Sequence, residues 1–244
     1  MSEKKDYVVG ADARVREKKD YVVDLETLGT GSNAPVVAIG IVSFDRHTGV
    51  VGDEKFYCTI DMESACKYGA VAEGGSVSWW LGQSEAARSA LTSKEFQVDA
   101  LAAAAAALAF LEDEEGMFAN VRMWGNGAAF DCEKLRNMFT RLGLVTPWNF
   151  WNERDVRTML ELYDDTWLPF PADKIKHHAL HDAEHEAERL AIAFLMHHAA
   201  RGALDTTTSD HAYPGAPADD ADFDPTQKEL DLTGSEYVPP VSQD

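Results

Sequence analysis

Two carboxylates stand at the end of a short apolar run, YVVDLETLG, at residues 21–29. In an extended strand residues two apart face the same side, so Asp24 and Glu26 project together. Two like charges about 4 Å apart repel by roughly 4 kcal/mol at an effective dielectric constant near 20. Such a pair needs a proton, a cation or a solvated surface. Hard cations that prefer oxygen ligands, Mg²⁺ or Mn²⁺, are the candidates for a buried pair.

A third carboxylate, Asp131, ends the segment WGNGAAFD at residues 124–131. Gly125 and Gly127 permit a tight backbone there. A carboxylate at the start of a helix is favoured by the exposed backbone amides. Asp131 is therefore either a ligand brought to the same place as the first pair or an ordinary acid of a first helical turn.

Four histidines lie close together in the segment HHALHDAEH at residues 177–185. His177 precedes Asp182 by five residues, so an imidazole on a loop and a carboxylate on a helix can converge. A histidine with a pKa near neutrality can take a proton from an attacking water while the acid binds a metal. A polar helix start is one alternative. A zinc site is another, because His181 and His185 lie one helical turn apart, with His177 and His178 nearby.

The motifs D-x-E, G-N-G-A-A-F-D and H-x-A-L-x-D-A, in this order, resemble those of the DEDDh branch of the 3′–5′ exonuclease superfamily. The similarity is greatest to short bacteriophage-type exonucleases and related bacterial exoribonucleases, and it covers roughly residues 21–200. The resemblance implies an α/β, ribonuclease H-like fold. Its mixed sheet would have three antiparallel strands and then parallel strands, flanked by helices.

The resemblance also implies a function and roles for the acids. It implies hydrolysis of phosphodiester bonds at single-stranded DNA or RNA 3′ ends, which releases nucleoside 5′-monophosphates. His177 would be the general base, although His178 and His181 stand where relatives often carry Asn or Asp. Two ions of Mg²⁺ or Mn²⁺ would be held by Asp24, Glu26, Asp131 and Asp182. The rival interpretation is a catalytically inactive module of the same fold that binds nucleic acid or protein.

Five further residues are candidates for binding the substrate. By the same resemblance, Thr27 and Leu28 would touch the terminal nucleotide through a backbone amide and a side chain. Trp79 and Trp80 can stack on a base, and we expect one of the two to do so while the other is core. Arg154 can bind a phosphate, and a second arginine three residues later is the alternative.

The overall charge limits the partners. The 244 residues carry a formal net charge of −20, which argues against a general electrostatic footprint for duplex DNA. Nucleic acid held through metal ions is still compatible with it. Ten of the acids lie at residues 205–244, against one basic residue, Lys228. We expect this segment to be a flexible acidic tail, which could dock a protein partner.

The composition indicates a soluble protein. No apolar stretch reaches the roughly 18 residues of a membrane span, and the polar EKKD near the start is unlike a secretory leader. Three cysteines without C-x-x-C spacing indicate a reducing compartment. We therefore expect a cytoplasmic location, in the host cytoplasm if a phage encodes the chain.

The chain divides into three parts by pattern. Residues 1–16 are expected to be a poorly ordered leader or duplicated segment, because EKKDYVV occurs at 3–9 and again at 17–23. Residues 17–204 form the exonuclease domain, followed by the tail. We predict strands over 21–29, 36–45, 50–61, 117–124 and 148–152, and helices within 76–91 and over 98–115, 131–143, 155–163 and 178–200. The Ala-rich helix suits a homodimer or the inside of a monomer equally well.

Overall fold

The computed structural model describes residues 18–112, 121–163 and 168–207. The described residues up to 202 belong to one compact unit, and residues 203–207 belong to a second unit. The expectations for the leader at 1–16 and for the acidic tail lie outside the described residues, except that the helix of the first unit runs on to 207. The predicted domain boundaries and the homodimer stay predictions.

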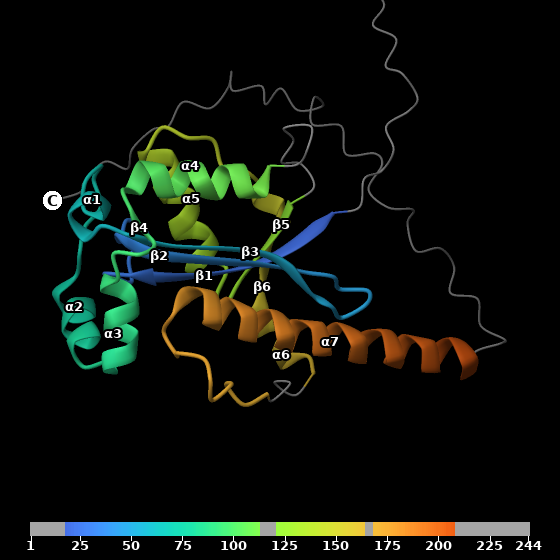
Figure 1. Ribbon diagram of the computed structural model, residues 1–244. Helices are drawn as coiled ribbons and strands as arrows, with labels where there is room; N and C mark the ends of the chain where they lie inside the picture. Colours follow the sequence, from blue (N-terminus) through green and yellow to red (C-terminus); the bar gives the residue numbers. More distant parts are fainter. Residues whose placement is uncertain (1–17, 113–120, 164–167, 208–244) are drawn as a thin grey trace, which may run out of the picture. The chain divides into compact units, whose positions relative to one another are not determined.

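A mixed sheet forms the centre of the molecule, with the strand order β4-β3-β2-β1-β5-β6 (Figure 1). The first three strands form an antiparallel meander, and the two beyond β1 run parallel to it. This arrangement confirms the predicted ribonuclease H-like sheet. The strands are β1 (Lys19–Thr27), β2 (Val36–Phe44), β3 (Val51–Ile60), β4 (Gln97–Val98), β5 (Val121–Gly125) and β6 (Glu153–Asp155).

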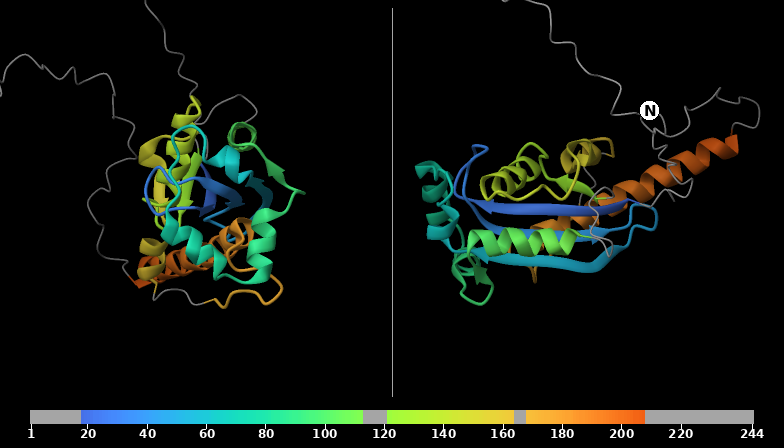
Figure 2. Two further views of the ribbon diagram at one scale, coloured as in Figure 1. Left: turned by 90° about the vertical axis from the view of Figure 1, so that its left-hand side faces the viewer. Right: turned by 90° about the horizontal axis from the view of Figure 1, so that it is seen from above.

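Helices cover both faces of this sheet. Helices α4 (Ala100–Leu111) and α5 (Asp131–Arg141) lie on one face, and α6 (Val156–Glu161) and α7 (Ala179–Thr207) lie on the other (Figures 1 and 2). The remaining helices are α1 (Met62–Ala65), α2 (Gly74–Leu81), α3 (Glu85–Thr92) and the 3₁₀ helix η1 (Phe150–Asn152). Helices α2 and α3 lie beyond the sheet, at the end where β1 finishes.

Because side chains alternate along β1, its residues face the two sides of the sheet in turn. Val23 and Leu25 belong to the core cluster under α4 and α5, whereas Val22 packs with α7. Residues two apart share a face, so Asp24 and Glu26 point to the side of α7. The Ala-rich helix packs inside the monomer, because three of its alanines are fully buried and its residues contact β3.

The start of β1 is fixed by a buried carboxylate. Asp20 is 3% exposed and accepts hydrogen bonds from Arg46 Nε at 2.8 Å and from Trp124 Nε1 at 2.7 Å. Arg122 Nε lies 3.1 Å from the same carboxylate. The charge of Asp20 is therefore matched by two arginines, and it ties β1 to β5 and to the β2–β3 hairpin.

Gly40 lets α7 approach the sheet beside the carboxylate pair. It is the partner of Asp24 in the β1–β2 register. A Cβ on Gly40 would lie 2.3 Å from the carbonyl carbon and oxygen of Ala179 and 2.4 Å from the nitrogen of Leu180. The first turn of α7 therefore rests on β2 next to Asp24, which brings Asp182 toward the end of β1.

The boundaries of several elements differ from those predicted. The strand predicted at 148–152 is wrong, because Phe150–Asn152 form a 3₁₀ helix and the strand follows at Glu153–Asp155. The long Ala-rich helix begins two residues later than predicted, where the side chain of Asp99 accepts from the amide of Ala102. Helix α7 continues through Gly202. Of the strand predicted at 117–124, residues 117–120 lie outside the described part.

Replacing Gly40 by alanine tests the seating of α7. The new methyl group would displace the backbone of Ala179, so we expect Gly40→Ala to lower the free energy of unfolding by at least about 1–3 kcal/mol. Chemical denaturation monitored by circular dichroism measures this loss. Gly75→Ala is the matched control, because nothing lies within 4 Å of its new Cβ. A Gly40→Ala protein as stable as this control would contradict the account.

Candidate active site

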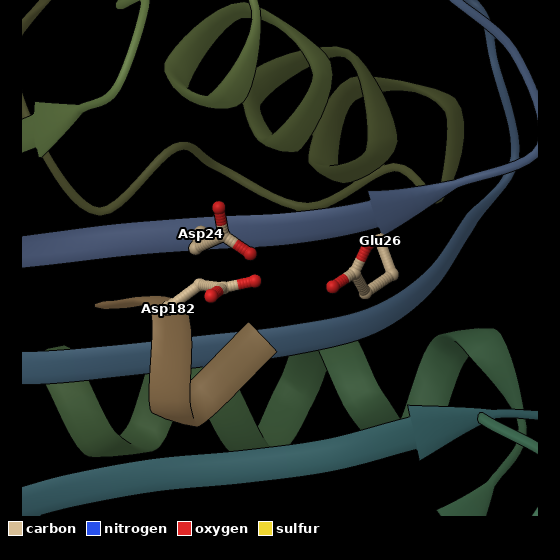
Figure 3. A group of neighbouring side chains, drawn as sticks. All are labelled: Asp24, Glu26 and Asp182. Carbon is tan, nitrogen blue, oxygen red and sulfur yellow. The ribbon is translucent and has the colours of Figure 1, made fainter. Parts of the chain in front are cut away.

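Three carboxylates converge where β1 ends and α7 begins. Asp24 and Glu26 come from β1, and Asp182 comes from the first turn of α7. One oxygen of each lies within 4.8 Å of one oxygen of the other two. Figure 3 shows the three side chains turned toward one another between the strand and the helix. Side chains more than 150 positions apart in the sequence thus form one cluster, as the motifs predicted.

Asp131 is the fourth acid of the site and lies at the start of α5, the helix that covers the other face of the sheet. It is the first residue of α5, is 2% exposed, and accepts hydrogen bonds from the backbone amides of Leu25 and Asn126. A Cβ on Gly125 would lie 3.0 Å from the Cβ of Asp131, so glycine there allows this approach. Leu25 directly follows Asp24 in β1, so Asp131 lies beside the first pair. Burial, followed by neighbouring charges that include that of Asp131, raises the pKa of Asp24.

Burial and mutual repulsion make these acids hard to ionise without a cation. Burial, with the charges of Asp182 and Asp131, raises the pKa of Glu26 to about 8. Burial raises the pKa of Asp131 to about 7 and that of Asp182 to about 6. It also raises the pKa of Asp24 well above its usual value. Oxygen Oε1 of Glu26 is buried without a hydrogen-bond partner, so the donor set fits a hard divalent cation.

His177 faces the cluster from the loop before α7. It lines a cavity of about 360 Å³ together with Asp24 and Asp182. Its backbone has a φ of 63°, unusual for a residue with a side chain, and its amide donates to Oδ2 of Asp182 at 2.8 Å. Burial and the charge of Lys176 lower the pKa of His177. The imidazole is thus neutral near pH 7, which a general base requires.

His178 is held away from this role by stacking. Its ring lies 4.3 Å from that of Tyr57 and 4.1 Å from that of His181. Burial and the charge of His181 lower the pKa of His178 to about 4. Of the two neighbouring histidines, His177 is therefore the one available to the cavity.

The zinc alternative finds no support in the described part of the chain. Nδ1 of His181 accepts a hydrogen bond from the amide of Ile175 at 2.9 Å, and His185 packs edge-on against Phe170. Among the described residues, three potential metal ligands lie close together, and they are Asp24, Glu26 and Asp182. No histidine belongs to this group of described residues.

The two tryptophans have different environments. Trp79 is 48% exposed, and its ring lies 5.0 Å from that of His177. Trp80 is buried, and its Nε1 donates to the carbonyl oxygen of Thr27 at 3.0 Å. The prediction that one of them is core therefore points to Trp80, which supports the end of β1. Trp79 stays the candidate for base stacking.

Thr27 and Leu28 are occupied by contacts within the protein. The hydroxyl of Thr27 donates to the carbonyl of Gly29 at 2.7 Å. The amide of Leu28 donates to the carbonyl of Pro35 at 3.0 Å, and the Leu28 side chain is buried. The amide of Leu28 is therefore already engaged within the protein. A contact through the Thr27 amide or either side chain stays a prediction.

Of the two candidate arginines, Arg157 is the one that lies near the acids. Its Nε donates to Oδ1 of Asn126 at 3.0 Å, and its charge opposes the rise in the pKa of Asp131. The guanidinium of Arg154 instead donates to the carbonyls of Trp151 and Glu153. Arg154 is thus engaged with the 3₁₀ helix, and Arg157 is the better placed of the two candidates.

Sequence reasoning missed one acidic residue at the site, Glu186. It lines the same cavity as Asp24 and His177 and is 5% exposed. The signal was its spacing, since it follows Asp182 by four residues and so shares its face of the helix. It was hidden among the other acids in the first turns of α7, Glu184 and Glu188.

Comparison with known proteins places the chain in a family. The model of the 3′–5′ exoribonuclease Rv2179c-like domain matches residues 19–194. The chain therefore belongs to this family, and the protein is a 3′–5′ exonuclease. It is also 25% identical over 192 residues to an exodeoxyribonuclease of Enterobacteria phage T4, which covers 69% of this chain and 84% of the relative. Membership of an exonuclease family confirms the predicted superfamily.

Solved structures of Escherichia coli exonuclease I share the fold. A zinc-bound complex with single-stranded DNA has a TM-score of 0.51 at 18% identity, covering 78% of this chain and 43% of that one. A complex with a dA16 oligonucleotide has a TM-score of 0.51 at 16% identity, with the same coverage. This chain thus matches less than half of exonuclease I. Among the described residues, no helix has the length and apolar character needed to cross a membrane.

The metal-free protein should lose stability as the pH rises. With the pKa of Glu26 at about 8 and that of Asp131 at about 7, the folded state holds protons between about pH 6.5 and 8.5 that the unfolded state has already released. We therefore expect Tm in EDTA to fall across this window, which thermal denaturation at several pH values measures.

The matched variant for this measurement is Glu26→Gln, which removes a group whose pKa is raised to about 8 and should flatten the pH dependence. Added Mn²⁺ should also flatten it, because the cation replaces the protons. A Tm in EDTA that is constant or rises from about pH 6.5 to 8.5 would contradict the account of the buried carboxylates.

Proposed function

We propose that the protein hydrolyses single-stranded nucleic acid from the 3′ end and releases nucleoside 5′-monophosphates, with two Mg²⁺ or Mn²⁺ ions bound at the carboxylate cluster. The observation that carries the proposal is the convergence of Asp24, Glu26 and Asp182 within 4.8 Å. Asp131 accepts a hydrogen bond from the amide of Leu25, the residue after Asp24. Four acids with raised pKa values in one place are a costly arrangement that bound divalent cations would relieve.

The residues of the site have separate roles, which are cation binding and proton transfer. Asp24, Glu26 and Asp182 would hold one cation, and Asp24 with Asp131 would hold the other. The chemistry that bound cations supply here is neutralisation of the phosphate oxygens and a lower pKa of the attacking water. His177 takes the proton of that water as it attacks phosphorus. The bond from phosphorus to the 3′-oxygen breaks, which leaves a shortened strand with a 3′-hydroxyl and a free 5′-monophosphate.

The loop before α7 holds the base where it is needed. The hydrogen bond from the His177 amide to Asp182 couples the position of the imidazole to that of a metal ligand. The indole of Trp79 lies edge-on to the same imidazole and stays half-exposed. A terminal base stacked on Trp79 would therefore bring its phosphate beside His177.

Both sugar types are proposed as substrates. The family is described by exoribonuclease activity, whereas the phage T4 relative is an exodeoxyribonuclease. The exonuclease I structures of the same fold contain single-stranded DNA. Matched DNA and RNA strands therefore belong in one assay, since discrimination would depend on contacts with the 2′-hydroxyl.

Asp24→Asn tests the hydrolytic site. The change keeps the size of the side chain but removes a charge shared by both proposed cations, so nucleotide release should fall at least about 100-fold. Digestion of 5′-labelled DNA and RNA oligonucleotides, with Mn²⁺ or with EDTA, measures direction, sugar preference and metal need together. Asp53→Asn, at an exposed position of β3, is the control and should stay fully active. Full activity of Asp24→Asn, or of the wild type in EDTA, would refute the proposal.

Trp79→Ala tests the base platform. Loss of one stacked base is worth about 1–3 kcal/mol, so KM for a single-stranded oligonucleotide should rise roughly 5- to 150-fold, with a smaller change in kcat. Steady-state kinetics measures both. Phe150→Ala removes another exposed ring, which precedes β6 in the 3₁₀ helix, and should leave KM unchanged. Equal KM values for the two variants would show that Trp79 does not bind the substrate.

A further inference from the structure

Helix α7 carries a second carboxylate on the face that bears Asp182. Glu186 follows Asp182 by four residues, so the two lie one turn apart on the same side of the helix. Ala183, Ala187 and Leu190 of this face are fully buried in the cluster between α7 and the sheet. Glu186 is itself only 5% exposed. A carboxylate thus occupies a position where the helix otherwise presents apolar side chains to the core.

One oxygen of this carboxylate lacks a partner. Among the described side chains, Oε2 of Glu186 is a buried atom without a hydrogen bond. The Glu186 side chain does hydrogen-bond with the side chain of Asn126, whose Oδ1 accepts from Nε of Arg157 at 3.0 Å. Arg157 therefore orients the amide of Asn126, and Asn126 orients Glu186. An oriented, buried carboxylate oxygen without a donor is costly unless something absent here binds it.

Hydrogen bonds, a shared cavity and electrostatics all place Glu186 near the proposed ligands. Among the charged groups around Asp24, Glu186 raises the pKa of that acid most, ahead of Glu26, Asp131 and Asp182. The charge that most raises the pKa of Glu186 is that of Asp131, ahead of Asp182. The backbone amide of Asn126 donates to Asp131, and the side chain of Asn126 hydrogen-bonds with Glu186. Glu186 therefore lies near Asp131. It also lines the cavity that Asp24 and Asp182 share.

We propose that Glu186 is a fifth carboxylate of the metal centre and contributes an oxygen to the cation between Asp24 and Asp131. This inference rests on the proposed two-cation function and assigns a ligand that the family motifs do not include. The first cation has the compact set Asp24, Glu26 and Asp182. The second would otherwise have carboxylates from Asp24 and Asp131 alone. Mg²⁺ and Mn²⁺ take oxygen ligands, and a cation there gives Oε2 of Glu186 the partner that it lacks.

Glu186→Gln tests the assignment through metal binding rather than through activity. The amide keeps an oxygen for Asn126 and removes the negative charge. Electron paramagnetic resonance and isothermal titration calorimetry count bound Mn²⁺ and give both dissociation constants. We expect the wild type to bind two ions, and the variant to bind the second at least about 10-fold more weakly, with the first changed less than about threefold. Without metal, the variant should have a Tm higher by at least about 2 °C, because folding no longer has to bury an ionisable carboxyl group.

Glu188→Gln is the matched control. It makes the same change two residues further along α7, at a side chain that is 37% exposed and pairs with Lys174 Nζ at 3.3 Å. Both Mn²⁺ affinities should equal those of the wild type.

Three results would count against the inference. A Glu186→Gln protein that binds both ions like Glu188→Gln would overturn it while leaving the proposed function intact. Equal weakening of both ions together with a lower Tm would show that Glu186 acts only in folding, and would overturn it as well. A wild type that binds no Mn²⁺ and releases no nucleotide would refute the proposed function and this inference with it.

Discussion

Repulsion between carboxylates that the fold forces together is the constraint on which this structure depends. Asp24 and Glu26 lie on one face of a central strand, and α7 brings Asp182 within 4.8 Å of both. Burial raises the pKa of every acid in this set. Keeping these acids together lowers the stability of the metal-free protein, and it also forms a binding site for divalent cations. The exonuclease fold can therefore be understood as a scaffold that holds oxygen ligands in position before the metal arrives.

The scaffold fixes both ends of β1 by different means. At its start, Asp20 is neutralised by Arg46 and Arg122 in a buried ion pair network. Near its end, Gly40 on the neighbouring strand allows the backbone of α7 to approach within van der Waals distance. A carboxylate paired with two arginines thus anchors the strand at one end, whereas Asp24 and Glu26 at the other end lie among further acids. The difference explains why one buried acid is structural and the others are suited to catalysis.

The sequence predicted the sheet and the acids well because both follow local rules. Alternation along residues 21–29 placed Asp24 and Glu26 on one face, and the spacing from His177 to Asp182 placed a loop histidine beside a helical acid. Other features depend on tertiary contacts that no local pattern encodes. The strand predicted at 148–152 is wrong, and the strand that does form there lies at Glu153–Asp155. Trp80 rather than Trp79 is the buried indole, and it donates a hydrogen bond to the carbonyl of Thr27. The role of Glu186 likewise emerges only when β5, α5 and α7 meet.

The central claim is that carboxylates from β1, α5 and α7 bind two divalent cations. Crystals of the protein soaked in Mn²⁺ and measured on both sides of the manganese absorption edge test it most directly. The account predicts two anomalous peaks, one among Asp24, Glu26 and Asp182 and one between Asp24 and Asp131. An absence of peaks at these acids in a fully soaked crystal, or peaks at His181 and His185 instead, would contradict it.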